Sequence, residues 1–410
     1  TATSDCLLPS FGALRRMSKS LPTLVPLTIS DTTLRDGAQM PGARFSIDDK
    51  VAVAEALAEA RVDVIEAGFP AVSELEIEAV RRIVAAVSGP MLMVLCRTVT
   101  GDIDAARRAL EHADPSRCGV GVFIGTSPLH RRSKLKKTKA ECLDMIGRSV
   151  EYARTHFQRV TFSCEDASRT EPAFLRQAYT LAMDAGATAI GFPDTVGVLT
   201  PETAAARTRM LLALARPRGV RLRVHFHNDL GLATANTLAA IKAGADIVHL
   251  TVGGLGERAG NAPLEETVMA LTLYPKRYRR SIGVDPTRLT GLCQLVSQLS
   301  GIALPPNKAV TGANIFATAA GVHQDGLLKN PDTYLPFRPE LVGAPGIRLP
   351  LSPLSGKAAL ANRLEECGIS LSPRQLVSAL RIMKNADKAD WADEEALLRR
   401  AADTARKELP

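Results

Sequence analysis

The chain of 410 residues has few aromatic side chains and no paired cysteines. Aromatic residues make up 4% of it, which leaves little for stacking on nucleic-acid bases. Its seven cysteines are scattered without a Cys-x-x-Cys pair, so we expect reduced thiols in the cytoplasm and no disulfide framework or zinc ribbon. No apolar run approaches the ~18 residues of a transmembrane helix. Residues 1–25 lack the continuous apolar segment of a signal peptide and are predicted to be a loose N-terminal extension.

The charge of the chain is basic but mostly interspersed. There are 51 Lys and Arg against 43 Asp and Glu, a formal net charge of +8. Two runs are dense, Arg131–Lys139 and Lys276–Arg280. Each fits either a solvated basic loop or a site for a phosphate-bearing ligand such as coenzyme A. A scaffold that binds nucleic acid is the less favoured interpretation, because aromatic side chains are so few.

From about residue 26, strand-like apolar runs alternate with segments of helical period, eight times over. The strand-like runs are 25–29, 62–67, 91–95, 119–124, 160–163, 189–192, 222–226 and 247–252. The helical segments include 47–60, 74–87, 139–154, 171–185, 200–215 and 232–243. Capping signals support several of them: Ser46 and Thr200-Pro201 stand at starts, and Gly186 and Gly244 follow ends.

Eight β-α units in roughly 260 residues predict an α/β fold, the closed (β/α)8 TIM barrel. No Gly-x-Gly-x-x-Gly follows the first strand, which disfavours an open dinucleotide-binding sheet. We therefore predict a catalytic barrel over residues 26–290. The pattern changes to helices and loops over 291–410, which are predicted to form helical subdomains that act as a lid or in dimerisation. In such a barrel the chemistry lies at the C-terminal ends of the strands.

Polar residues stand at many of those predicted strand ends, where burial without a use would be costly. They are Asp36, Glu66, Arg97, Glu165, Asp194, Thr195, His225, His227 and Asn261. His225 and His227 project to one side of their strand, because side chains alternate with period two. With the Asp36 carboxylate and the Asn261 amide they form a mixed nitrogen and oxygen set. Such a set suits Mg, Mn, Fe(II), Co or Zn with open coordination positions.

The open positions of such a metal fit a 2-oxo acid, which chelates through its keto oxygen and carboxylate. The metal would polarise the keto carbon, and Arg35 beside it would stabilise the charge that develops. Simpler roles stay open for these residues. Asp36 could cap a turn, Asn261 could cap the next helix, Arg35 could pair with Glu66 or Asp194, Glu165 could be buried and paired, and His323 could be a surface residue.

Four segments resemble motifs of the DRE-TIM metallolyase superfamily and, within it, of the Claisen-condensing synthases of homocitrate, isopropylmalate and citramalate. They are Asp31-Thr32-Thr33-Leu34-Arg35-Asp36-Gly37, His225-Phe226-His227-Asn228-Asp229-Leu230-Gly231, Gly254-Leu255-Gly256-Glu257-Arg258-Ala259-Gly260-Asn261 and the run from Gly321 to Pro331. The last resembles the second-subdomain motif of the synthases and argues against the hydroxymethylglutaryl-CoA lyase branch. The resemblance covers residues 26 to about 375, and its wording is closest to bacterial homocitrate synthases.

The resemblance implies a role for each candidate residue. A divalent metal would be held by Asp36, His225, His227 and Asn261. The acceptor would be bound by Arg35 beside its keto oxygen, by Thr195 near its carboxylate, by Gln39, and by Arg97 through a distal anion. Removal of a methyl proton from acetyl-CoA would be helped by Glu165 and His323, with Tyr334 nearby. Homodimers of the family imply that His323 acts in trans on the partner's barrel.

The predicted reaction condenses acetyl-CoA with a metal-chelated 2-oxo acid and then hydrolyses the thioester, as in homocitrate synthase. Ala38 replaces the glutamate or asparagine common in the family, so phosphonopyruvate, 2-oxoisovalerate and pyruvate stay open as acceptors. A retro-aldol lyase is less favoured, because the His323 motif is present. We expect no nucleic-acid or membrane partner. Since the chain ends without a long regulatory domain, we also expect no feedback control by leucine.

Overall fold

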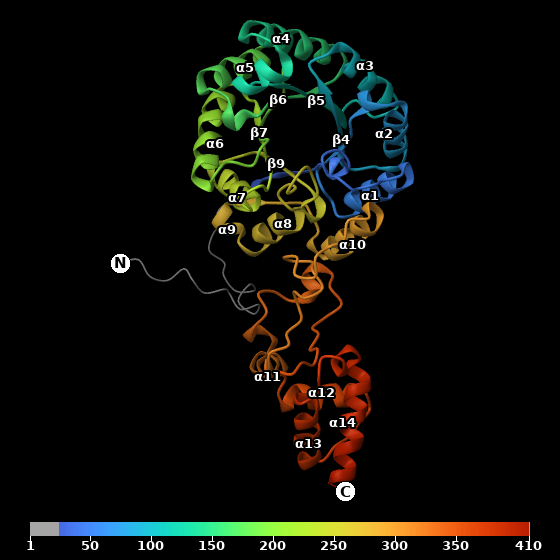
Figure 1. Ribbon diagram of the computed structural model, residues 1–410. Coiled ribbons are helices and arrows are strands. Elements are labelled where there is room, and N and C mark those ends of the chain that lie inside the picture. The colour runs from blue at the N-terminus through green and yellow to red at the C-terminus, as the bar shows by residue number, and fades with distance from the viewer. Residues whose placement is uncertain (1–23, 410) are drawn as a thin grey trace, which may run out of the picture.

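The computed structural model describes residues 24–409 and forms a closed barrel of eight parallel strands, which confirms the predicted TIM barrel (Figure 1). The strands pair in chain order, and the last pairs with the first. They are β2 (Thr28–Asp31), β3 (Val64–Gly68), β4 (Met91–Arg97), β5 (Cys118–Gly125), β6 (Arg159–Glu165), β7 (Ala189–Asp194), β8 (Arg221–Phe226) and β9 (Ile247–Leu250). Most of the predicted extension 1–25 lies outside the described residues.

Helices surround the barrel, and the predicted caps Ser46 and Thr200 stand directly before two of them. They are α1 (Ile47–Glu59), α2 (Glu74–Ala86), α3 (Thr100–Ala109), α4 (Lys139–His156), α5 (Pro172–Asp184), α6 (Pro201–Ala215), α7 (Ala233–Ala243) and α8 (Leu264–Leu273). Ser46 accepts a hydrogen bond from the backbone of Asp49, whose carboxylate bonds back to Ser46. Gly244 ends α7 at a φ of 113°, a backbone conformation that a side chain would strain.

One predicted strand start is wrong. Val25 and Pro26 form a separate short strand, β1, which pairs in parallel with β10 (Arg280–Ser281) outside the barrel. Pro26 has no backbone N–H, so it disfavours the continuous ladder of a central strand. The barrel ladder therefore begins at Thr28, which pairs with Ile247.

Side chains alternate between the inside of the barrel and the layer under the helices. On β5, Phe123 lines the central pocket, and a Cβ on Gly121 would meet Arg223 inside the barrel. Val120 and Val122 alternate with them and are fully buried in the main apolar core. The interior is thus left free for polar groups, while the core between strands and helices carries the stability.

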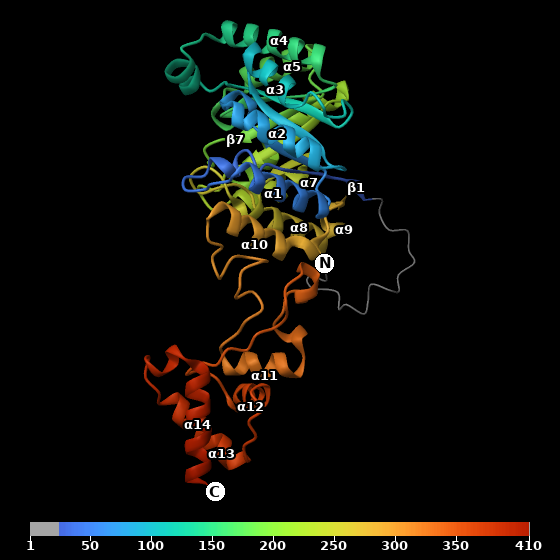
Figure 2. The same ribbon diagram turned by 90° about the vertical axis from the view of Figure 1, so that its right-hand side faces the viewer.

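The C-terminal region follows α9 (Pro275–Tyr278) and α10 (Leu289–Ser300). It contains α11 (Gly321–Lys329), α12 (Lys357–Glu366), α13 (Pro373–Lys384) and α14 (Glu394–Glu408). The last three helices share an apolar cluster of their own, with Leu360 and Leu398 fully buried. Figures 1 and 2 both place this region beside the barrel, beyond α8 and α10.

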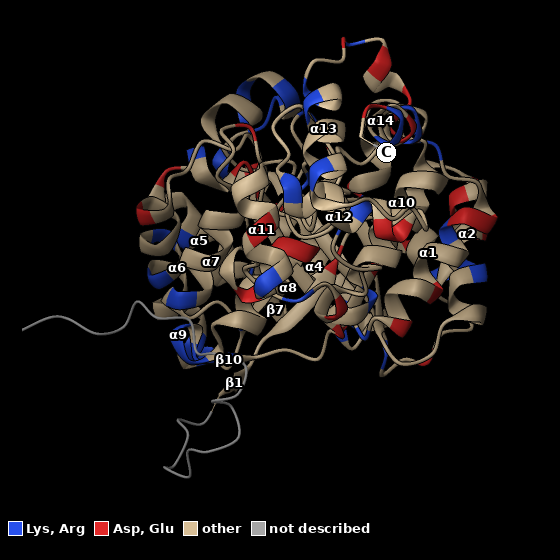
Figure 3. Cartoon of the chain, turned by 90° about the horizontal axis from the view of Figure 1, so that it is seen from below, with Lys and Arg blue, Asp and Glu red and all other residues tan. Residues whose placement is uncertain are grey.

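Charges of both signs are intermixed over the helices (Figure 3). The basic run at Lys276 lies on α9 and continues into β10. None of its residues lines the pocket described below. Within residues 24–409, no helix is both long and apolar enough to cross a lipid bilayer.

Candidate active site

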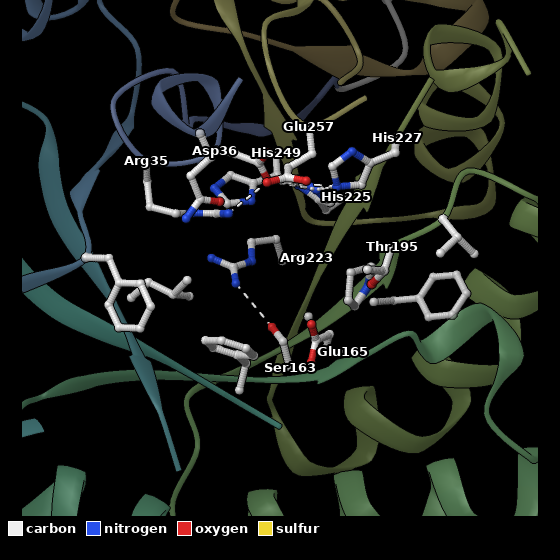
Figure 4. Close-up of a pocket in the computed structure, with 18 of the residues that line it drawn as sticks. Arg35, Asp36, Ser163, Glu165, Thr195, Arg223, His225, His227, His249 and Glu257 are labelled. Atoms are coloured by element: carbon white, nitrogen blue, oxygen red, sulfur yellow. Dashed lines mark hydrogen bonds and ion pairs between the residues drawn. The ribbon is translucent and has the colours of Figure 1, made fainter. Parts of the chain in front are cut away.

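A pocket of about 490 Å³ opens at the C-terminal ends of the strands, within the size range of small-molecule sites. Figure 4 shows its polar side chains converging from several strands. Seven of the predicted site residues line it: Arg35, Asp36, Gln39, Glu165, Thr195, His225 and His227. The fold therefore brings predicted site residues together although they lie up to 192 positions apart in the chain, as Arg35 and His227 do.

Asp36, His225 and His227 form a buried triad whose potential ligand atoms all lie within 4.8 Å of one another. The Nε2 atoms of the two histidines are 3.1 Å apart. The Oδ2 atom of Asp36 lies 3.5 Å from Nε2 of His225 and 3.8 Å from Nε2 of His227. Two imidazole nitrogens bound at right angles to one ion, at ~2.1 Å each, would stand about 3 Å apart.

The protonation of the triad suits a metal. Burial lowers the pKa of both histidines, and for His225 the neighbouring His227 lowers it further, so both rings are neutral. Burial raises the pKa of Asp36, but the net shift is downward, with the guanidinium of Arg35 as the largest lowering cause, and the carboxylate is ionised. Oδ1 of Asp36 is buried without a hydrogen-bond partner among the described residues. A divalent ion fits this donor set and would compensate its buried polar atoms.

Asn261 completes the predicted ligand set from the loop after β9. Its backbone pairs with that of His227, and its Nδ2 donates to the carbonyl of Leu255 at 3.0 Å. Its Oδ1 is buried without a partner in the described chain. The simpler helix-cap role does not apply, because α8 begins after Pro263. Asp36 likewise precedes the turn η2 (Gly37–Gln39), but its side chain makes no capping bond there.

Gly256 supports this centre by having no side chain. A Cβ there would lie 2.1 Å from Nδ2 of Asn261 and 3.1 Å from Oδ1 of Asp36, and the φ of 151° adds strain. Replacing Gly256 by alanine should weaken Mn²⁺ binding by about 10- to 100-fold, because the ligands must separate. Calorimetric titration with Mn²⁺ measures this. Gly219→Ala is the matched control, with a φ of +65° and nothing within 4 Å of the added Cβ. Equal Mn²⁺ affinity in the two variants would contradict this role.

Arg35 links the triad to the buried carboxylate of Glu66. Its Nε lies 2.5 Å from Glu66 Oε2 and its Nη1 lies 2.8 Å from Asp36 Oδ2. Thr32 also donates to Glu66, and Nε2 of His249 lies 3.5 Å away. Burial raises the pKa of Glu66, but Arg35 and Arg223 lower it more, so the net shift is downward. Arg35 therefore forms the ion pair with Glu66 that was one of its open alternatives, and it also lines the pocket.

Glu165 is paired with a lysine on the far side of the pocket. Nζ of Lys134 lies 2.7 and 2.8 Å from the two carboxylate oxygens. Nδ1 of His130 lies 3.5 Å from Oε2. Both partners stand on a short π-helical segment, η4 (His130–Leu135), which follows β5. One residue of the first basic run thus has a specific partner in the pocket rather than only solvent.

The three predicted substrate-binding residues, Thr195, Gln39 and Arg97, lie at different positions relative to the pocket. The Thr195 hydroxyl accepts from the backbone of Asp166 at 2.8 Å and keeps its own proton for a ligand. Gln39 is exposed at the rim. Arg97 is not among the lining residues; its side chain is 57% exposed and held by two bonds from its guanidinium to Asp102.

His323 and Tyr334 lie together, but away from this pocket. Their ring centroids are 4.4 Å apart. His323 is on α11, which lies in the region beside the barrel (Figure 2). Neither ring is among the residues that line the pocket. Both side chains are exposed. Within one chain, therefore, the structure does not bring His323 to Glu165.

Several polar residues of the pocket were not predicted as site residues, among them Arg223, His249 and Lys134. The period of two could have found Arg223, since it precedes His225 by two positions on β8 and faces the same side. His249 lies on β9, one residue before its end, and pairs with His225 of β8. Lys134 had no comparable signal, because its contact with Glu165 depends on how η4 folds after β5.

Two protein-family models match the chain. The first, described as HMGL-like, matches residues 26–296. The second, described as homocitrate synthase post-HMGL domain-like, matches residues 310–390 and so contains the His323 and Tyr334 segment.

Curated relatives match over most of the chain. It is 45% identical over 365 residues to the 2-isopropylmalate synthase of Pyrococcus abyssi, a match that covers 88% of this chain and 75% of the relative. It is 47% identical over 360 residues to the 2-isopropylmalate synthase of Streptococcus gallolyticus, covering 87% and 69%. The predicted nearness to bacterial homocitrate synthases stays a prediction.

Solved structures share the fold. The HMG-CoA lyase from Brucella melitensis aligns with a TM-score of 0.57 at 24% identity, over 68% of this chain and 99% of that one. The hydroxymethylglutaryl-CoA lyase from Pseudomonas aeruginosa aligns with a TM-score of 0.58 at 21% identity, over 69% and 95%. At these identities the likeness concerns the barrel alone.

Proposed function

Because the chain belongs to the HMGL-like family, in the branch of the Claisen-condensing synthases, we propose that it condenses acetyl-CoA with a 2-oxo acid and releases coenzyme A. The observation that carries this is the buried triad of Asp36, His225 and His227 at the mouth of the barrel. The relatives named 2-isopropylmalate synthase support the reaction class. The second-subdomain match supports a synthase over a retro-aldol lyase, which remains the alternative.

In this proposal, different residues bind the acceptor and stabilise the charge that develops on it. A divalent metal, held by Asp36, His225, His227 and Asn261, would polarise the keto group of the acceptor. Arg35 places a permanent cation beside that group and stabilises the negative charge that forms on its oxygen. The Thr195 hydroxyl donates to the carboxylate of the acceptor.

A base must take a proton from the methyl group of acetyl-CoA, so that the resulting enolate carbon can attack the keto carbon. We assign this proton transfer to Glu165, which lines the pocket, together with His323 and Tyr334. A positioned base supplies ~10²–10⁴-fold, so charge stabilisation must carry the rest. Water then hydrolyses the thioester, which frees coenzyme A and makes the condensation irreversible.

We also propose that the active enzyme is a homodimer in which His323 and Tyr334 serve the partner's pocket. Both residues are exposed and lie beside their own barrel, so a second copy of the chain is the natural source of the missing base. The cytoplasmic location and the absence of nucleic-acid and membrane partners stay predictions. The acceptor in the sequence-based proposal is 2-oxoglutarate, with 2-oxoisovalerate, pyruvate and phosphonopyruvate as alternatives.

The proposal predicts acceptor-dependent release of free thiol from acetyl-CoA. With Mg²⁺ or Mn²⁺, one 2-oxo acid of the panel should give a signal that a chelator abolishes, because the metal holds the acceptor. A thiol reagent that absorbs on reaction measures the rate. Silence across the whole panel, with metal shown to be bound, would refute the synthase proposal and favour the lyase.

A further inference from the structure

A buried arginine stands at the floor of the pocket. Arg223 on β8 is 7% exposed, and Figure 4 shows its guanidinium between the triad and Ser163. Nη2 donates to Oγ of Ser163 at 3.2 Å. Nη1 lies 3.8 Å from Oε1 of Glu66, which is too long for a hydrogen bond. A full positive charge is therefore held inside the barrel, beside the space where an acceptor would bind.

Glu66 offsets the charge of Arg223 but accepts no hydrogen bond from it. Its other oxygen already accepts from Arg35 at 2.5 Å and from Thr32 at 2.7 Å. A guanidinium has five N–H donors, and Arg223 makes one hydrogen bond within residues 24–409. Burying a charged group with so few partners is costly unless a ligand supplies the others.

The neighbouring strands leave room beside the guanidinium. A Cβ on Gly191 would lie 2.2 Å from Oγ of Ser163 and 3.4 Å from Nε of Arg223. A Cβ on Gly121 would lie 3.8 Å from Nη2 of Arg223. Both glycines face the barrel interior, so their missing side chains keep the surroundings of Arg223 open to the pocket.

The balance of charges around the pocket also favours a ligand with two anionic groups. Inside the barrel, Arg35 and Arg223 offset Asp36 and Glu66. At the mouth, Lys134 pairs with Glu165 and Arg258 pairs with Asp229. Glu257 adds one negative charge there, but it is exposed, so solvent screens it. A divalent ion at the triad would add two positive charges to the buried group inside the barrel. The carboxylate of a simple 2-oxo acid returns one negative charge. A second anionic group on the acceptor returns the other, and in a poorly solvated pocket such a balance matters more than in water.

We propose that Arg223 and Ser163 bind a second anionic group at the far end of the acceptor, so that the substrate is a 2-oxo acid with a terminal carboxylate or phosphonate. This inference rests on the proposed function and narrows its acceptor. It moves the distal-anion site from Arg97, which Asp102 holds outside the pocket, to a residue inside the barrel. An acceptor with a branched apolar end, such as 2-oxoisovalerate, would leave the guanidinium unpaired.

The test uses the Mn²⁺-loaded enzyme with two readouts. Thiol release from acetyl-CoA is measured for oxaloacetate, 2-oxoglutarate, phosphonopyruvate, pyruvate and 2-oxoisovalerate, and calorimetry measures binding of each acid without acetyl-CoA. The variants are Arg223→Met and Ser163→Ala. Arg280→Met is the matched control, since Arg280 is also 7% exposed but lies outside the pocket.

We expect the wild type to prefer one acid with a second anionic group. Oxaloacetate and 2-oxoglutarate test a terminal carboxylate, and phosphonopyruvate tests a phosphonate. Arg223→Met should lower kcat/KM and affinity for that acid by about 100-fold and leave 2-oxoisovalerate unaffected, while Arg280→Met keeps the wild-type preference. Equal or better turnover and binding of 2-oxoisovalerate by the wild type would overturn the inference. If no acid releases thiol, the proposed function fails, yet calorimetry still decides the role of Arg223. Should Arg223→Met fail to fold, the wild-type panel and Ser163→Ala decide it.

Discussion

Replacing Asp36 by alanine is expected to abolish divalent-metal binding and turnover together. Asp36 is the one carboxylate in a triad with two neutral imidazoles, so its loss leaves the ion without an anionic ligand. It also frees Arg35, whose Nη1 now lies 2.8 Å from Asp36. Unneutralised positive charge at the centre would repel a cation. Because loss of an outer partner alone costs ~10–100-fold in metal affinity, loss of a ligand should cost more than about 100-fold.

Metal content by elemental analysis and Mn²⁺ titration would measure this effect. The matched control is Asp102→Ala, because Asp102 and Asp36 are both 3% exposed and both paired with an arginine, but Asp102 lies outside the pocket. The control should keep its metal. If Asp36→Ala bound Mn²⁺ with wild-type affinity while remaining folded by circular dichroism, the assigned metal centre would be wrong.

The barrel was predictable because its signals are local. The alternation of strand-like and helical runs gave all eight strands within a few residues, and the capping box at Ser46 marked the start of α1 at Ile47. The exception is Pro26, whose missing N–H moved the first two residues into another sheet. Local signals predict elements well, but they do not show which strand an edge residue will pair with.

The site was partly predictable for a related reason. Residues at the ends of parallel strands must converge, so the separation of Asp36 from His225 along the chain was no obstacle. Side chains whose roles depend on tertiary contacts were harder to assign. Lys134 reaches Glu165 through the fold of a π-helical loop, and Arg97 is held by Asp102 rather than by a ligand. Whether an arginine is paired or free cannot be read from its position in the chain.

Replacing His323 by alanine is expected to stop the proton transfer while sparing the first binding steps. His323 is exposed on α11 and does not line the pocket of its own chain. Metal and 2-oxo acid binding should therefore be unchanged, and turnover should fall by ~10²–10⁴-fold, the usual contribution of a positioned base. Exchange of the acetyl-CoA methyl protons with deuterated solvent measures the step directly. His112→Ala, at an exposed histidine on the barrel side, should exchange normally. Normal exchange in His323→Ala would remove this residue from the relay.

A mixture of two inactive variants can tell which copy supplies His323. In dimers that contain one Asp36→Ala and one His323→Ala chain, an action in trans leaves one pocket with an intact triad and an intact partner histidine. Random assembly makes half of the dimers mixed, so about a quarter of wild-type turnover should return on co-expression. If each histidine served its own barrel, every pocket would carry one defect and no turnover would return. The position of α11 beside its barrel, away from Glu165, favours the first result.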